Sequence, residues 1–240
     1  AGCTGKDAEG SSAGGSGEQT AAADSRQNEA GSNTEAAPKT ETAATASRSW
    51  SNMSLVSSMD LLYADQFSVD YYENDISLIT IGDTDQFLLL PEGMSAPVGL
   101  PDSIKILQKP VKNIYLVATS AMDDFIHLDA MDLIALSGTK DTGWYLPEAK
   151  TAMEEGKIAY AGKYSAPDYE KILSSDCGLA VESTMIYHTP EVKEQLERLG
   201  IPVLVERSSY EGHPLGRMEW IRLLSLIHNS EPTRLRCISY

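Results

Sequence analysis

Residues that could support covalent or acid–base chemistry are present, but they are not arranged as a catalytic set. Ser183 and His188 share the segment ESTMIYH, yet no third group is placed in sequence to orient the histidine, as a hydrolase triad requires. Asp123 and Asp124 could act as a general acid and base, but carboxylates in the first turn of a helix are explained more simply as partners of the helix dipole or as docking charges. We therefore expect no catalytic residues; a surface-anchored α/β hydrolase that uses Ser183 and His188 is the alternative.

The sequence also lacks motifs for a cofactor or a metal ion. It has no GxGxxG, no Gly-rich lysine loop and no GxSxG elbow. The three cysteines, Cys3, Cys177 and Cys237, lie far apart, and the four histidines are scattered. Cys177 directly precedes the apolar run GLAVE, which favours a small buried side chain over a nucleophile. We expect no cofactor and no metal site.

Side chains suited to binding a ligand are concentrated between the expected strands and helices. They are aromatic, basic or hydroxyl-bearing, and they are Ser120, Trp144, Tyr164, Tyr187, Arg207 and Tyr210. An aromatic rim with one or two basic residues suits a flat, partly apolar, anionic small molecule. Each residue also has a structural interpretation: Trp144 could pack a loop onto the sheet, and Arg207 could pair with the neighbouring Glu206.

The elements that must position these side chains alternate between strand and helix. Hairpin strands are expected between residues 61 and 93, where β-branched and aromatic residues are interrupted by Asn-Asp and Gly-Asp turns. Short apolar runs then alternate with amphipathic segments, in which Ser120 can cap one helix and Pro147 opens another. The expected strands are 113–119, 133–136, 157–162, 178–183 and 201–206, and the expected helices are 120–131, 146–156, 165–175, 189–200 and 213–223.

This alternation predicts βαβ units and a parallel sheet. The expected fold class is α/β: a three-layer, Rossmann-like lobe over residues 51–212, preceded by a short β-hairpin region and followed by the start of a connector helix at 213–223. Right-handed crossovers place the carboxyl end of every parallel strand along one edge. We therefore expect the candidate binding residues to share that edge.

Composition excludes several classes of function. The 240 residues include 19 Lys and Arg against 35 Asp and Glu, a formal charge of −16. A surface this acidic repels phosphate backbones, so we expect no nucleic-acid partner. No run of eighteen apolar residues is present, so no segment of the sequence is expected to cross a bilayer.

Both ends of the chain differ from the middle. Residues 1–49 contain no Leu, Ile, Val, Met or aromatic residue and predict a disordered tether over 1–50. The opening AGC resembles the end of a bacterial lipoprotein signal, with Cys3 as the lipidated residue, although a chance cysteine in a tail is the alternative. Residues 224–234 resemble the translation of a transposon-type sequencing adapter, so we expect 224–240 to be read-through rather than native sequence, a natural irregular end being the alternative.

Four runs carry a resemblance to a known family: YLVATSAMDDFIHLDAMDLIALSGT, GKYSAPDYEKIL, CGLAVESTMIYHTPEVKEQLERLGIPVLVE and HPLGRMEWIRL. Together they resemble the first lobe of the substrate-binding lipoproteins of bacterial ABC importers for iron–siderophore complexes, haem and cobalamin. The resemblance spans residues 61–223. It implies a ligand cleft between two lobes joined by a stiff helix, with the second lobe beyond this chain and weak affinity for one lobe alone.

The resemblance further implies the partners and the localisation. The protein would be lipid-anchored outside the cell membrane, capture a siderophore complex or haem, and deliver it to an ABC permease and its ATPase; a corrinoid ligand is the alternative within the class. Asp123 falls where the family carries an acidic residue that docks on the permease, although the family more often has Glu and a different lead sequence. An adhesion or scaffold lipoprotein without a small ligand is a further alternative.

Overall fold

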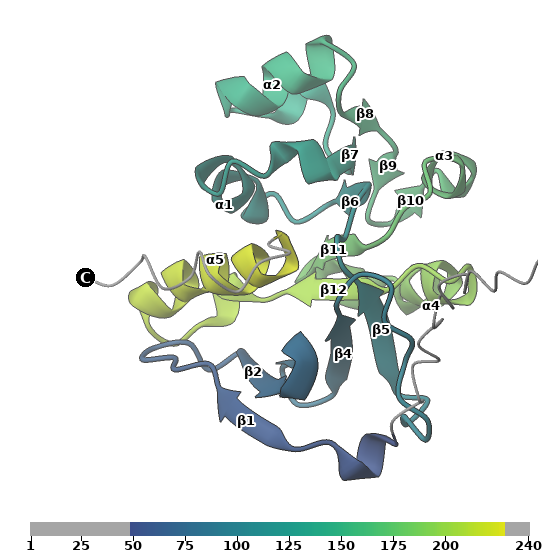
Figure 1. The fold of residues 1–240 in the computed structure, drawn as a ribbon. Coiled ribbons are helices and arrows are strands. Elements are labelled where there is room, and N and C mark those ends of the chain that lie inside the picture. The colour runs from purple at the N-terminus through teal and green to yellow at the C-terminus, as the bar shows by residue number, and fades with distance from the viewer. Residues whose placement is uncertain (1–48, 229–240) are drawn as a thin grey trace, which may run out of the picture. The chain divides into compact units, whose positions relative to one another are not determined.

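The computed structural model describes residues 49–228. The predicted lipidation site Cys3, nearly all of the predicted tether and residues 229–240 lie outside this range. The described part is α/β, as expected, and contains two five-stranded sheets (Figure 1). No helix in this part of the chain has the length and apolar character that crossing a membrane requires.

The first sheet is larger than the predicted hairpin region. Its strands follow chain order, and all neighbours are antiparallel except β4 and β5, which are parallel. The expected hairpins over residues 61–93 are confirmed as β2, β3 and β4, but β1 and β5 extend the sheet on either side. The strands are β1 (Leu55–Ser58), β2 (Phe67–Tyr72), β3 (Ser77–Ile81), β4 (Asp85–Leu90) and β5 (Ile104–Gln108).

The second sheet is entirely parallel, which confirms the predicted alternation. Its strand order is β12-β11-β6-β7-β8. The chain therefore starts in the middle at β6, adds β7 and β8 on one side, and then adds β11 and β12 on the other. The strands are β6 (Ile114–Leu116), β7 (Ile134–Ser137), β8 (Ala159–Tyr160), β11 (Ala180–Ser183) and β12 (Val203–Glu206).

The described part of the chain contains five α-helices, which pack against the parallel sheet in two apolar clusters (Figure 1). One apolar cluster joins one face of the sheet to α1, α2 and α5, and it includes Phe125, Ala149 and Trp220. A second cluster joins the opposite face to α3 and α4 through Ile172 and Leu196. The helices are α1 (Ala121–His127), α2 (Pro147–Glu154), α3 (Tyr169–Ser174), α4 (Pro190–Arg198) and α5 (Pro214–His228).

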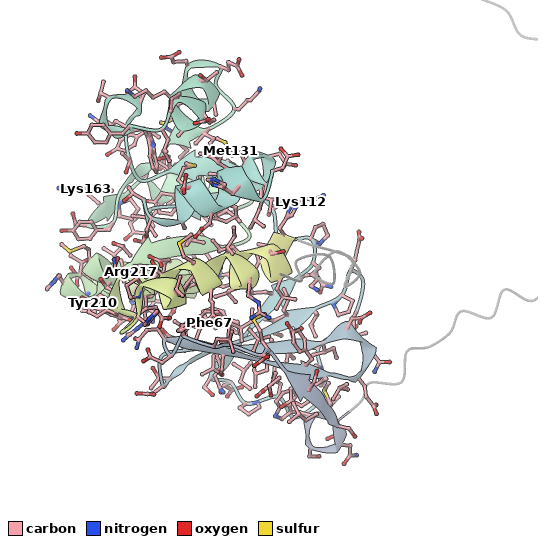
Figure 2. All side chains as sticks on the ribbon, turned by 90° about the vertical axis from the view of Figure 1, so that its left-hand side faces the viewer. Phe67, Lys112, Met131, Lys163, Tyr210 and Arg217 are labelled. Atoms are coloured by element: carbon pink, nitrogen blue, oxygen red, sulfur yellow. The ribbon has the colours of Figure 1, made fainter. Side chains whose placement is uncertain are left out.

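The first sheet joins the core of the parallel sheet through one of its faces. Phe67 on β2 packs edge-on against Trp220 of α5, with ring centroids 5.0 Å apart (Figure 2 labels Phe67 beside this helix). Because side chains alternate along a strand, the other face carries a separate apolar cluster around Ile76, Leu78 and Leu88. The two sheets are thus held together by a shared hydrophobic core in which α5 takes part.

Two local predictions are wrong. Ser120 stands directly before α1, but its backbone is helical and its side chain makes no cap hydrogen bond; the hydroxyl binds Glu206 instead. The helix expected from residue 165 begins only at Tyr169, with Asp168 as its cap. The preceding residues form a hairpin of β9 (Gly162–Lys163) and β10 (Ala166–Pro167). Gly162 has φ +86°, and a Cβ there would meet the backbone of Ala166, so the hairpin requires glycine.

The last helix also differs from expectation. We expected its apolar stripe to end at Leu223, but α5 continues to His228. Leu224, Leu226 and Ile227 are buried in the same core as Trp220. These residues therefore pack as part of the helix, whatever the origin of the sequence that encodes them.

Candidate functional site

The carboxyl ends of β6 and β12 are joined by a hydrogen-bonded link that passes over the end of β11. Ser120, which follows β6, donates its hydroxyl to Glu206 Oε2 at 2.6 Å. The other oxygen of Glu206, the last residue of β12, accepts the backbone N–H of Ser208 at 2.6 Å. This arrangement fixes the start of the short 3-10 turn η6 (Ser208–Tyr210) at the edge where ligands of open α/β sheets bind.

Arg207 lies at the start of this turn in a fixed orientation. Its Nε and Nη2 groups both donate to the side-chain oxygen of Gln66, at 3.0 and 2.9 Å. The amide nitrogen of Gln66 in turn donates to Asp65 at 2.7 Å, which fixes the amide with its oxygen toward the arginine. The guanidinium also lies 5.6 Å from the centre of the Tyr210 ring, within cation–π range.

No carboxylate neutralises Arg207 among residues 49–228. Ion pairs in this range join other cations to acids, such as Lys193 to Asp85 and Arg198 to Glu194. The direct partner of Arg207 is a neutral amide, and its Nη1 group has no hydrogen-bond partner in the same range. In a chain of formal charge −16, an oriented but unpaired guanidinium is available to bind an anion.

The segment that carries Gln66 is held against α5 by two carboxylates. Glu219 accepts the backbone N–H groups of Leu62, Tyr63 and Ala64 at 2.7–2.9 Å. Glu211 accepts those of Asp65 and Gln66, and also the indole N–H of Trp220 at 2.7 Å. Burial alone would raise the pKa of Glu219, but the three backbone N–H groups, assisted by Arg222, lower it below its usual value.

Two acidic side chains in the first turn of α1, Asp123 and Asp124, differ in environment. Burial, together with the charge of Glu206, raises the pKa of Asp124 to about 6. Asp123 is exposed, and its carboxylate lies 3.6 Å from the ring nitrogen of His127 one turn later. The pKa of His127 is raised, first by its hydrogen bond to the backbone of Asp123 and then by the charge of that carboxylate.

A further carboxyl group is buried near the same edge on the other face of β11. Glu182 is fully buried, and neither of its oxygens has a hydrogen-bond partner within the described residues. It is two residues from Ala180, so it faces the cluster that contains Tyr115 and Val205. Burial raises the pKa of Glu182 to about 8, and the carboxyl is mainly protonated at neutral pH.

The other predicted binding residues are not joined to Arg207 by any contact in the described part of the chain. Trp144 is 4% exposed and donates its indole N–H to Ser137, so it packs its loop onto the sheet. Tyr164 is half-buried against the cluster of α3 and α4. Tyr187 is exposed in η5 (Thr184–His188), where Lys193 lies 6.0 Å from its ring. The structure thus brings together Ser120, Arg207 and Tyr210.

The residues of the alternative hydrolase are not connected. Ser183 ends β11 and His188 ends η5, and no hydrogen bond joins them within residues 49–228. Cys177 is half-buried and unbridged, and burial raises the pKa of its thiol. Residues 49–228 contain no group of three or more His, Cys, Asp or Glu arranged to hold a metal ion.

A groove of about 750 Å³ lies on the opposite edge of the parallel sheet. It is lined by residues of α2, by Met131 and Asp132 of η3 (Met131–Leu133), and by Lys157 and Ile158 directly before β8. These are the amino ends of β7 and β8. The groove is therefore separate from the edge that carries Arg207, and no pattern in the sequence predicts it.

Arg207 and Tyr210 are predicted from the sequence as binding residues, but Gln66 and the carboxylates that orient this segment are not. Gln66 lies 141 positions from Arg207, and no local pattern links the two. The acidic residues do have a sequence signal: Glu182 lies within the mostly apolar strand β11, Glu206 ends the apolar run of β12, and Glu211 and Glu219 lie on either side of the start of α5. A charged residue in an apolar run indicates a specific buried partner or a site.

Comparison with known proteins gives one relevant similarity. No family model matches the chain. An uncharacterized lipoprotein of Methanocaldococcus jannaschii is 24% identical over 203 residues, an alignment that covers 73% of this chain and 48% of the relative. The chain thus spans about half the length of the curated relative it matches.

Proposed function

We propose that this chain is an extracytoplasmic substrate-binding lipoprotein that captures an iron complex, either a siderophore complex or haem, and delivers it to an ABC importer. The observation that carries the proposal is Arg207, an oriented and unpaired guanidinium beside the exposed ring of Tyr210 at the carboxyl edge of a parallel sheet. Iron–siderophore complexes and haem combine apolar surface with anionic groups. Such ligands match an aromatic ring next to a cation.

The fold also supports a proposal about the architecture of the domain that contains the parallel sheet. Helices α1, α2 and α5 share a core with one face of the parallel sheet, and α3 and α4 share a core with the other. Together with the strand order β12-β11-β6-β7-β8, these two cores support the inference of a three-layer, Rossmann-like lobe. If the lobe has this fold, the change of direction at β6 predicts a ligand crevice between the loops after β6 and β11, next to the link between Ser120 and Glu206.

Two further points support membrane anchoring and delivery. The relative in Methanocaldococcus jannaschii is named a lipoprotein, and the opening AGC offers Cys3 as the residue to be lipidated. Asp123 is exposed in the first turn of α1, next to the same sheet edge, where it can meet arginines of a permease. A corrinoid remains the alternative ligand of the same importer class.

The proposal is tested by titrating the full 240-residue chain, uniformly labelled with ¹⁵N, with a panel of ligands. The panel contains the gallium(III) complex of a triscatecholate siderophore, haemin and cyanocobalamin. Gallium(III) replaces iron(III) without paramagnetic broadening, and NMR detects the weak binding expected of a single lobe. We expect one anionic complex to shift the signals of Ser120, Arg207 and Tyr210.

Two results would oppose this assignment. If no member of the panel shifts these signals, or if the shifts fall on the groove around Met131 and Ile158, the importer proposal is wrong. Hydrolysis of a p-nitrophenyl ester that is lost in Ser183→Ala would instead support the surface hydrolase. No contact in the structure favours that alternative at present, because Ser183 and His188 are not hydrogen-bonded.

A further inference from the structure

A second arginine lies against the same turn as Arg207. Arg217, in the first turn of α5, is exposed and donates to the backbone oxygen of Ser209 at 3.3 Å. Figure 2 shows Arg217 and Tyr210 next to each other at the start of this helix. Arg207 and Arg217 therefore approach the turn η6 from β12 and α5 respectively.

Neither guanidinium is neutralised by a carboxylate in the part of the chain that the structure describes. Arg207 donates to the amide of Gln66, and Arg217 donates to a backbone oxygen. The nearby acids are occupied by other donors. Glu206 accepts from Ser120 and from the backbone of Ser208, and Glu211 accepts from Trp220 and two backbone N–H groups.

The guanidinium of Arg207 lies between a glycine and an aromatic ring. Gly82, in the turn between β3 and β4, has φ +57°, and a Cβ at this position would stand 3.6–3.8 Å from the guanidinium of Arg207. The guanidinium thus rests near bare backbone on this side and near the Tyr210 ring, which is 58% exposed, on another. A planar anionic group can stack on the ring while it accepts hydrogen bonds from the arginine.

From these contacts we infer that Arg207 and Arg217 form one anion site at the turn η6, and that the ligand carries at least two negatively charged oxygen groups. The inference rests on the proposed function and narrows its ligand class. It favours complexes with several carboxylates or catecholate oxygens, including haem with its two propionates, over an uncharged corrinoid. Two guanidiniums from different elements can each bind a separate oxygen group of such a ligand.

The test uses citrate as a simple trianion on the full chain, read through the side-chain Nε–Hε signals of the arginines. Citrate is expected to shift the signals of Arg207 and Arg217 together and to leave Arg198 unchanged, because Arg198 is already paired with Glu194 at 3.0 Å. The variants R207Q and R217Q should each weaken citrate binding about tenfold, the loss of one charge-assisted contact. R198Q is the matched control and should bind as the wild type does.

The outcomes separate this inference from the proposed function. Shifts by citrate without binding of any metal complex would retain the anion site and remove the importer role. Binding of a gallium complex that R217Q leaves unchanged would retain the importer role and overturn the two-arginine site. Two further results would overturn the two-arginine site. One is that millimolar citrate shifts the signals of neither Arg207 nor Arg217, and the other is that cyanocobalamin binds more strongly than the anionic complexes.

Discussion

Among the individual residues, Glu182 is a carboxylic acid that lies in apolar surroundings. Its side chain is fully buried on β11 and has no hydrogen-bond partner in the described range. The ionisable groups that face it are the phenols of Tyr115 on β6 and Tyr169 on α3, whose own pKa values are raised first by burial and then by negative charges that include Glu182. No cation offsets an ionised Glu182, so burial favours the neutral acid.

The raised pKa of Glu182 predicts that the fold loses stability as the pH rises from about 4.5 to about 8. The folded pKa of about 8 exceeds the ordinary value of 4.5, so the folded state holds this proton more tightly than the unfolded chain does. The contribution is complete below pH 4.5 and is lost as the pH rises through 8. Glu182→Gln mimics the neutral acid and should remove this loss, so above pH 8 the variant should be more stable than the wild type.

Urea unfolding between about pH 5 and pH 9 measures this effect as the difference between the wild type and Glu182→Gln, because the ionisation of Asp124, with a pKa of about 6, contributes equally to both proteins. Glu148→Gln, a change on the exposed face of α2, is the control and should follow the wild-type curve. Parallel curves for the wild type and Glu182→Gln would show that the carboxyl is ionised in the folded state and would contradict the prediction.

At the scale of elements, the site depends on the contact between α5 and the segment before β2. Glu219 and Glu211 bind five consecutive backbone N–H groups, from Leu62 to Gln66. A carboxylate that accepts several backbone N–H groups holds a loop firmly, since each of these hydrogen bonds is charge-assisted. The position of Arg207 is therefore set by a helix that begins seven residues later in the chain, through a segment from the other sheet.

Glu219→Gln should loosen this segment. The amide keeps the size of the side chain but loses the charge and one acceptor oxygen, so we expect a loss of about 1–2 kcal/mol in the free energy of unfolding. Because the pKa of Glu219 is lowered in the fold, its contribution is present above the ordinary value of 4.5 and fades as the pH falls below it. The variant should thus differ most from the wild type near neutral pH.

Hydrogen exchange at the amides of Leu62, Tyr63 and Ala64 gives the local measurement. We expect faster exchange at these amides in Glu219→Gln than in the wild type. Glu194→Gln removes an exposed carboxylate that pairs only with Arg198, and it should leave both stability and these amides nearly unchanged. Unchanged exchange at residues 62–64 in Glu219→Gln would show that the carboxylate does not hold the segment.

Elements were easier to predict from sequence than the contacts between them. Apolar runs such as IPVLVE and helices that open with proline, such as Pro147 and Pro190, follow local rules and were found. The short hairpin at Gly162 was missed because strands of two residues leave no periodic pattern. The cap at Ser120 was wrong because a distant acceptor, Glu206, competes for its hydroxyl.

At the scale of the whole molecule, the described part joins two sheets through one core. Phe67 from the first sheet and Trp220 from α5 pack together within this core, which also contains Leu204 of the parallel sheet. Parallel pairing follows from the alternation of strand and helix, so the edge that carries Arg207 could be predicted. The contribution of the first sheet to that edge, through Gln66, could not be predicted, because it depends on how the two sheets pack.

The central claim is that the carboxyl edge of the parallel sheet binds an anionic metal complex through Arg207. The most direct measurement compares the affinities of wild type, Arg207→Gln and Arg198→Gln for the gallium complex of a triscatecholate siderophore. We predict that Arg207→Gln weakens binding at least about tenfold, as expected for one charge-assisted contact, while Arg198→Gln binds as the wild type does. Equal affinity of all three proteins, with unchanged folding, would contradict the account.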